Sequence, residues 1–360
     1  MVKGLAFLAV RLRLFALIAV AALLFSPEGA DARTITDSAG RIVDVPDQVA
    51  WVYASGPPAA IMLYVLAPEK LAGWPRALRD AERPYIAEAY RDLPATGRLT
   101  GRGDTANLEV VIGANPDLIV DFGSVNETYS SLADRVQAQT GIPYVLINGR
   151  FENTPDALRL MGEILGVEER AEKLAAYVEM LFGDIDAALA DIPLDKRPRI
   201  YLARGPDGLE TGLRGSINTE IIERAGGRNV ADPGLDSPVR RGLVRASPEQ
   251  VIIANPDTIV TWDPTFFESV WETPIWQGID AVENGRVYLA PSLPFGWIDR
   301  PPSLNRIMGL RWLSAVFFPD RFPLDLEAAT REFYSLFYHV DLPDEDLNRL
   351  TAAAKGGRPE

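Results

Sequence analysis

The chain of 360 residues contains no cysteine and only one histidine, His339. The absence of cysteine excludes disulfides, thiolate metal sites and a cysteine nucleophile. A single histidine disfavours direct capture of zinc or manganese, because protein sites for these ions commonly use several histidines. The sequence also lacks a G-x-S-x-G elbow, a P-loop and an H-E-x-x-H motif. We therefore expect no resident metal, no cofactor and no enzyme active site.

Long apolar runs are missing as well, except near the N-terminus. Three basic residues precede the apolar run 14–25, and the tripeptide Ala30-Asp31-Ala32 follows it. This order predicts a secretory signal peptide, residues 1–32, that is cleaved after Ala32. A run of 12 residues is short for a membrane span. Without a cysteine the chain has no lipid anchor, so we expect it in the periplasm of a Gram-negative cell.

The balance of charge is acidic, with a formal net charge of −14. Such a chain repels polynucleotides and stays soluble, so we expect a monomer with no nucleic-acid partner. The overall charge does not exclude a basic cleft for a small ligand, because a few arginines can gather inside an acidic shell.

A weak internal duplication is the most informative feature of the sequence. The segments 107–122 and 247–262 both contain the tetrapeptide Ala-Asn-Pro-Asp, and Glu109 and Glu249 lie at the same offset of 140 residues. Each segment reads as a short helix, a Pro-Asp turn and a strand covered on both faces. The duplication predicts two similarly built halves.

Short apolar runs surround both copies of the repeat. They are residues 49–54, 70–74, 144–148, 199–203 and 286–290. Their alternation with helical stretches indicates βα units and a mostly parallel sheet. We expect an α/β fold with two Rossmann-like lobes, residues 33–155 and 194–318, and a ligand cleft between them.

The segment 156–193 lies between the predicted lobes. Residues 170–191 contain no proline and carry apolar residues at helical spacing. We expect a single long helix that joins the lobes, although a surface helix of one lobe would show the same pattern. Residues 319–350 are predicted to form a helical segment on the C-terminal lobe, and residues 351–360 a disordered tail.

Three motifs together resemble a known family. Asn-Leu-Glu and Asn-Pro-Asp occur in 107–122, Ser-Pro-Glu and Asn-Pro-Asp in 247–262, and a third motif spans 214–231. They resemble the ferric-siderophore- and cobalamin-binding periplasmic proteins of ABC importers, whose lobes are joined by one helix. The resemblance implies a substrate-binding protein in which Glu109 and Glu249 dock onto an ABC permease dimer.

Loops at the carboxyl ends of parallel strands are the expected place for a ligand. Arginine and aromatic residues recur in these loops. The candidate ligand-binding residues are Tyr53, Trp74, Arg102, Arg150, Arg204, Arg240, Arg241, Trp262, Phe295, Trp297 and Arg300. Guanidinium groups bind oxyanions and stack on flat rings.

The predicted ligand is therefore a small anionic molecule, an iron(III) chelate of the siderophore type. A molybdate or tungstate oxyanion, cobalamin or haem are the alternatives within the same fold. Outside this class, a periplasmic enzyme or a ligand-sensing domain is the alternative.

Overall fold

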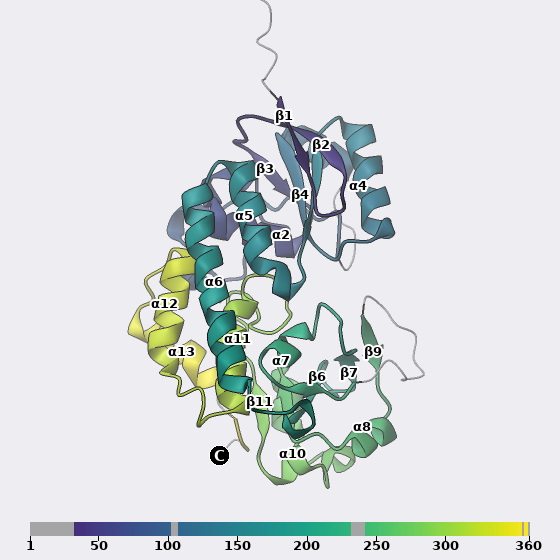
Figure 1. The fold of residues 1–360 in the computed structure, drawn as a ribbon, viewed down its shortest axis with the longest axis vertical. Coiled ribbons are helices and arrows are strands. Elements are labelled where there is room, and N and C mark those ends of the chain that lie inside the picture. Colours follow the sequence, from purple (N-terminus) through teal and green to yellow (C-terminus); the bar gives the residue numbers. More distant parts are fainter. Residues whose placement is uncertain (1–31, 102–106, 232–241, 355, 359–360) are drawn as a thin grey trace, which may run out of the picture.

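An N-terminal and a C-terminal α/β lobe lie one above the other in the computed structural model, which describes residues 32–101, 107–231, 242–354 and 356–358 (Figure 1). The predicted signal peptide lies outside the described residues except for Ala32. This residue begins strand β1 (Ala32–Thr36), which pairs antiparallel with β2 (Ile42–Pro46). The hairpin covers the edge of the N-terminal lobe, where the Ser38 amide donates to the Leu146 carbonyl.

The N-terminal lobe is built on a parallel sheet with the order β3-β4-β5. These strands are β3 (Val52–Ala54), β4 (Leu118–Gly123) and β5 (Tyr144–Asn148). A parallel bridge between Val52 and Leu71 extends the sheet beyond β3. The helices of this lobe are α2 (Pro57–Leu66), α3 (Leu108–Ala114) and α4 (Glu127–Thr140).

The C-terminal lobe has a parallel sheet with the order β11-β10-β6-β8. These strands are β6 (Arg199–Ala203), β8 (Arg228–Asn229), β10 (Thr258–Thr261) and β11 (Val287–Leu289). A separate antiparallel pair consists of β7 (Glu210–Gly212) and β9 (Leu243–Arg245). The helices are α7 (Glu220–Arg224), α8 (Pro248–Ala254), α9 (Pro264–Ser269) and α10 (Asp280–Glu283).

The two copies of the repeat have the same local structure. Helices α3 and α8 end at Asn115 and Asn255, which adopt the left-handed conformation with φ of 43° and 36°. Asparagine tolerates this conformation better than most residues do. Each asparagine leads through a Pro-Asp turn into an internal strand, β4 or β10, of its own sheet. The structure thus confirms two α/β lobes with mostly parallel sheets.

One long helix joins the lobes, as predicted. Helix α5 (Thr154–Leu165) ends at Gly166, whose φ of 68° suits glycine, and α6 (Glu168–Leu189) follows. α6 has 22 residues, which gives a rod of roughly 33 Å that runs past both lobes (Figure 1). None of the helices in the described part of the chain is long and apolar enough to cross a membrane.

The C-terminal helices differ from the expectation. They are α11 (Arg306–Phe317), α12 (Leu326–Tyr338) and α13 (Asp344–Ala353). α12 packs on both lobes, not only on the second, because its aromatic residues find partners on both sides. The Tyr64 hydroxyl of α2 donates to the Tyr338 carbonyl, and the Trp297 indole donates to the Tyr334 hydroxyl over 3.4 Å.

The ordered chain also extends into the predicted tail. α13 continues to Ala353, and Gly356 forms a bridge with Tyr288 of β11. The reason is burial, because Leu347 and Leu350 of α13 lie in the main hydrophobic core. Residues 351–354 are therefore ordered and not part of a disordered tail.

Candidate functional site

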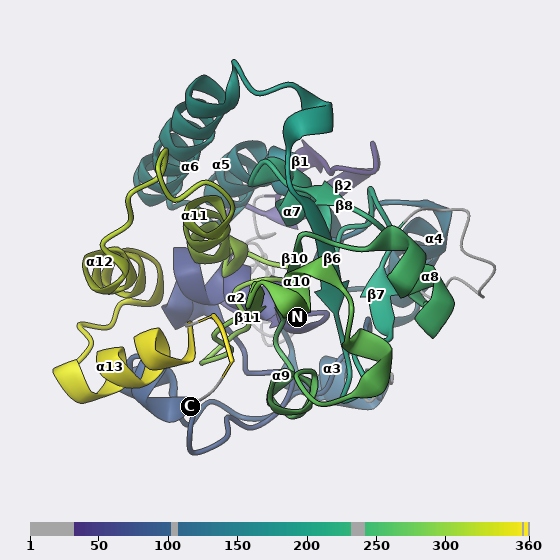
Figure 2. The same ribbon diagram turned by 90° about the horizontal axis from the view of Figure 1, so that it is seen from below.

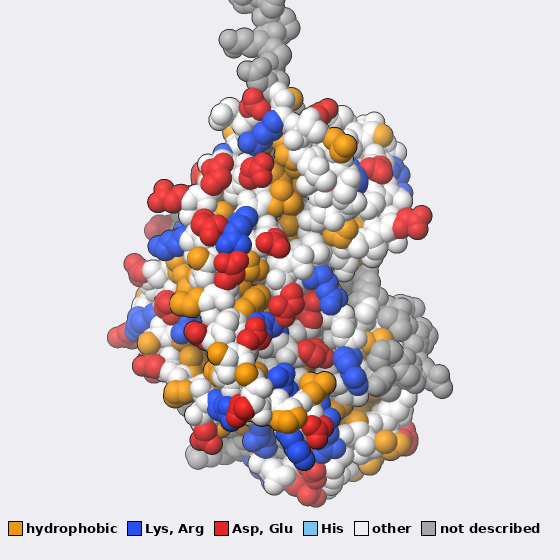
Figure 3. Space-filling view, in the orientation of Figure 1, with side chains coloured by type: hydrophobic (Ala, Val, Ile, Leu, Met, Phe, Trp, Pro, Cys, Tyr) orange, Lys and Arg blue, Asp and Glu red, His pale blue; other side chains and the backbone are white. Residues whose placement is uncertain are grey.

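The space between the lobes is lined by loops that follow the parallel strands, and the outline of the molecule is hollowed there on the side away from α6 (Figure 3). Three predicted residues of the C-terminal lobe come together at this edge. Arg204 follows β6, Trp262 follows β10, and Arg300 lies in the loop after β11. The Cζ atoms of Arg204 and Arg300 are 5.2 and 4.3 Å from the centroid of the Trp262 ring. Both distances are within the range of a cation–π contact.

The two arginines differ in their electrostatic surroundings. Arg204 is buried and pairs with Glu210, with Nε and Oε1 3.1 Å apart, and with Asp299. Two carboxylates therefore compensate its charge, and its main effect is to hold the Trp262 ring. Arg300 is exposed on the same ring.

The Nε1–H group of the Trp262 indole is unusual in its hydrogen bonding. Its Nε1–H is buried and has no hydrogen-bond partner in the part of the chain that the structure describes. Buried indole nitrogens usually donate to a partner. The Trp262–Arg300 pair thus combines a flat, partly buried indole ring with an exposed cation. Such a surface can stack on a flat group and pair with a negative charge.

The N-terminal lobe contributes a polar cluster that sequence reasoning missed. Asp121 is buried in β4, and the Thr100 hydroxyl lies 3.3 Å from its Oδ1. The hydroxyls of Ser55 and Thr100 are 3.2 Å apart. Burial raises the pKa of Asp121, which favours its neutral form. A signal was present in the sequence, since Asp121 interrupts an otherwise apolar strand.

Four predicted aromatic residues are buried instead of facing the space between the lobes. They are Tyr53, Trp74, Phe295 and Trp297. The Tyr53 hydroxyl donates to the Thr96 carbonyl over 2.6 Å, and the Trp74 indole donates to the Tyr90 carbonyl over 2.8 Å. The Trp297 indole donates to Tyr334, and Phe295, which has no polar atom, packs against Trp74 and Tyr338. The prediction that the four residues contact ligand is corrected here, because they are buried among other side chains of the protein.

Arg150 lies where the two lobes meet, a region we call the waist: residues 149–152 after β5, helix α7, and Arg306 of α11. The Arg150 side chain crosses from the first lobe to the second. Its Nε is 3.0 Å from Glu220 Oε2, and its Nη1 donates to the Gly215 carbonyl over 2.8 Å. The side chain is half-exposed. It links the lobes, and its guanidinium already binds Glu220 and the Gly215 carbonyl.

A fully buried arginine, Arg306, forms the centre of the waist. Its Nη1 donates to Glu220 Oε1 over 2.8 Å, and its Nη2 donates to the Gly149 carbonyl over 2.8 Å. Glu220 Oε1 also accepts the Phe151 amide over 2.7 Å. Arg306 and Glu220 therefore tie the first lobe to the second. Figure 3 shows acidic and basic side chains gathered where the lobes meet.

Glu223 of the waist should make stability depend on pH. Neither of its carboxylate oxygens has a hydrogen-bond partner in the described ranges, and burial raises its pKa to about 7. Because the pKa of Glu223 is raised in the folded protein, the protonated side chain favours the folded state. This stabilisation is complete below pH 4.5, the ordinary pKa of a glutamate, and is lost as the pH rises through 7. Replacing Glu223 by glutamine should therefore stabilise the protein at pH 8 by up to about 3 kcal/mol, and much less at pH 5.

Urea denaturation at the two pH values measures this difference. The control is Glu163→Gln on the exposed face of α5, which should give the same small change at pH 5 and pH 8. An equal effect of Glu223→Gln at both pH values would contradict the expected titration between them.

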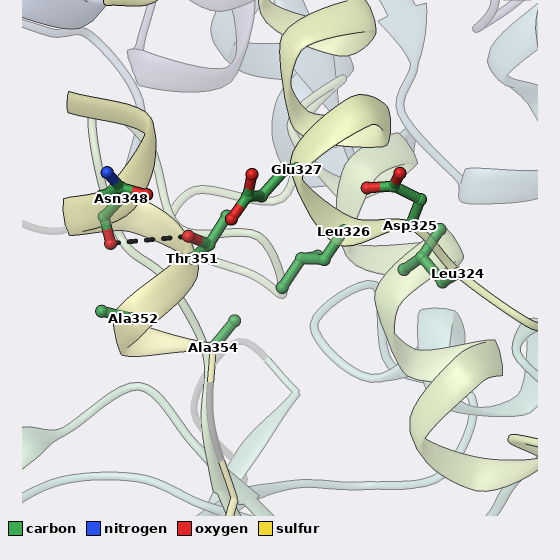
Figure 4. Close-up of a pocket in the computed structure, with 8 residues that line it drawn as sticks. All are labelled: Leu324, Asp325, Leu326, Glu327, Asn348, Thr351, Ala352 and Ala354. Carbon is green, nitrogen blue, oxygen red and sulfur yellow. Dashed lines mark hydrogen bonds between the residues drawn. The ribbon is translucent and has the colours of Figure 1, made fainter. Parts of the chain in front are cut away.

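Some predicted residues cannot be placed. Arg102, Arg240 and Arg241 lie outside the described residues. Within the described ranges, no group of three or more histidine, aspartate or glutamate residues could hold a metal ion. A cavity of about 630 Å³ lies between α12 and α13 (Figure 4), and none of the candidate ligand-binding residues lines it.

The two predicted docking glutamates occupy matching positions. Glu109 and Glu249 are exposed in the first turns of α3 and α8. Asn107 caps α3 by accepting the Glu109 amide over 3.1 Å, and Ser247 forms a capping box with Gln250 at the start of α8. Figure 2 shows both helices on the side of the molecule away from α6.

Two α/β lobes braced by one long helix, with a ligand-sized platform at the edge of one sheet, define the class of two-lobed solute-binding proteins. The chain belongs to the periplasmic binding protein family, whose profile matches residues 63–293. Members of this family are substrate-binding proteins, not enzymes.

Three similar proteins carry names that bear on function. An uncharacterized ABC transporter substrate-binding lipoprotein of Bacillus subtilis is 27% identical over 60% of this chain and 66% of its own. A vitamin B12-binding protein of Salmonella typhimurium is 26% identical over 49% of this chain and 64% of its own. The match thus spans just under two thirds of these curated relatives. The structure of an ABC transporter solute binding protein from Sulfurospirillum deleyianum has a TM-score of 0.79 and 31% identity, with coverage of 89% of this chain and 99% of that one.

Proposed function

We propose that the chain is a periplasmic solute-binding protein that binds an iron(III) chelate of the siderophore type and delivers it unaltered to an ABC permease dimer. The Trp262–Arg300 surface at the edge of the C-terminal sheet carries the ligand part of this proposal. The names of the relatives support delivery to an ABC transporter. The protein acts as an exported monomer from which residues 1–32 are removed, and it has no catalytic residue.

The ring of Trp262 favours a chelate over a bare oxyanion. A bare oxyanion would need several donors, whereas Arg204 at this ring is already paired with Glu210 and Asp299. The exposed guanidinium of Arg300 lies against the same ring, so this surface combines a cation with a flat group. Catecholate arms supply both a flat group and net negative charge, which matches this surface. Cobalamin is the second candidate, because it has a flat ring system and a relative is named for it.

A titration of the purified mature protein tests the ligand class. The probes are a ferric catecholate chelate, a ferric hydroxamate chelate, cobalamin, haem and molybdate, with tryptophan fluorescence as the readout. We expect saturable quenching by a ferric chelate. Trp262→Ala should weaken binding of the chelate about 10- to 100-fold, because an aromatic anchor commonly contributes roughly 1.5–3 kcal/mol to the binding free energy. Arg300→Gln should weaken anionic chelates more than cobalamin.

The matched control is Trp51→Ala. Trp51 is exposed and precedes β3, at the opposite end of the strand from the candidate site. Its loss should leave affinity unchanged. Saturation by cobalamin alone would replace the chelate with the second candidate. No fluorescence change with any of the five probes, or an equal loss of affinity in Trp262→Ala and Trp51→Ala, would refute the proposed site.

A further inference from the structure

Two exposed isoleucines lie at equivalent places in the two lobes. Ile112 on α3 is 50% exposed and Ile252 on α8 is 52% exposed, and they are 140 residues apart, like the rest of the repeat. Their neighbours Val111 and Val251 are buried. The burial pattern of the two short helices is therefore similar, although Val110 is exposed where Gln250 is half-buried.

Each isoleucine lies beside a docking glutamate. Glu109 and Ile112 are three residues apart on α3, as are Glu249 and Ile252 on α8, so each pair shares one face of its helix. Val110 and Ile253 are also exposed and enlarge the apolar area in each lobe. A single exposed aliphatic residue is ordinary. The same acidic-and-aliphatic pair at matched sites of two lobes needs a common cause.

We propose that Glu109–Ile112 and Glu249–Ile252 are two equivalent halves of one docking surface, and that each isoleucine inserts into an apolar pocket beside a basic group of one permease subunit. This inference rests on the proposed function, delivery to a permease. Two equivalent contacts on one chain fit a partner that displays the same site twice, which is a two-fold related pair of subunits. The carboxylates require that the partner sites be basic.

The two residue types contribute differently to docking. Exposed carboxylates steer the encounter and fix orientation, and salt screens their effect. Burying an isoleucine side chain stabilises the complex through the hydrophobic effect, which moderate salt does not screen. The isoleucines therefore supply the part of the affinity that persists when ionic strength rises.

The experiment compares Ile112→Ser, Ile252→Ser and the double variant with the unaltered protein. Binding to the cognate permease–ATPase complex in lipid nanodiscs is measured at low and at high salt. Each single variant should weaken binding by a similar factor, about 3- to 10-fold, and the double variant by about 10- to 100-fold at both salt concentrations. The matched control is Met180→Ser with Leu194→Ser, two residues that are 57% and 66% exposed away from α3 and α8. The control should bind as well as the unaltered protein does.

A second pair of substitutions separates this inference from the proposed function. Glu109→Lys with Glu249→Lys should abolish docking. If it does so while the double serine variant docks normally, the apolar contact is refuted and delivery to a permease stands. If the unaltered protein does not bind the complex, delivery is refuted and this inference with it. If only one of the two isoleucines matters, the two-fold equivalence is wrong.

Discussion

Replacement of Arg306 by leucine should lower the free energy of unfolding by about 3–5 kcal/mol. Arg306 is fully buried, and its guanidinium donates to Glu220 and to the Gly149 carbonyl. Without it, Glu220 would keep only the half-exposed Arg150 and the Phe151 amide as partners. The Gly149 and Ile217 carbonyls would also lose their buried donor. Removing one member of a buried charged network is strongly destabilising, whereas the intact network costs little net. Urea denaturation monitored by circular dichroism measures the change.

Two further variants show whether the loss comes from Glu220, which would then be paired with Arg150 alone. Arg321→Leu breaks an ion pair with Asp191 in which both side chains are largely exposed, so it should cost far less than Arg306→Leu. Adding Glu220→Leu to Arg306→Leu should restore part of the stability, because it removes the buried charge. A loss for Arg306→Leu no larger than that for Arg321→Leu would contradict the role of the waist.

Several contacts connect the two lobes. α6 runs past both lobes, Arg306 and Glu220 connect them at the centre, and α12 contacts both through Tyr64 and Trp297. A long continuous helix resists bending more than extended strands would. We therefore expect only modest closure of the lobes on binding, which small-angle scattering with and without ligand would contradict by showing a large contraction.

Local sequence patterns predicted the scaffold well. The predicted runs 144–148 and 199–203 coincide with β5 and β6, because continuous apolar runs between turn residues leave few alternatives. The long helix 170–191 is shifted by only two residues from α6. The repeat predicted the position of a strand in each sheet, because each Asn-Pro-Asp turn ends a helix and leads into a strand.

The candidate site was predicted less well, because it depends on contacts between residues far apart in the sequence. Trp297 and Trp262 both follow strands of the second lobe, but only Trp297 is covered by Tyr334, 37 residues further on. Arg306 and Glu220 are 86 residues apart, and nothing in either local sequence marks them as a pair. Whether an aromatic or charged residue lines the site or lies inside the protein is decided by such distant partners.

Reversal of both docking charges, Glu109→Lys with Glu249→Lys, should abolish stimulation of the permease–ATPase complex and leave ligand affinity unchanged. Both glutamates are exposed in the first turns of α3 and α8, outside the loops that carry Trp262 and Arg300. In the docked complex each lysine would face a basic group, and like charges held together in an interface cost several kcal/mol. Each single reversal should weaken docking substantially, and by a similar factor, because the two sites are equivalent.

The control for this reversal is Glu163→Lys with Glu283→Lys, which changes the net charge equally at exposed positions of α5 and α10. It should dock normally, so that a general change of charge is distinguished from a local contact. The reversed docking variant should also melt close to the unaltered protein, because the charge of an exposed residue in the first turn of a short helix has only a small effect on stability. A loss of ligand affinity in that variant would assign Glu109 and Glu249 to the ligand site, and normal stimulation would remove them from the permease interface.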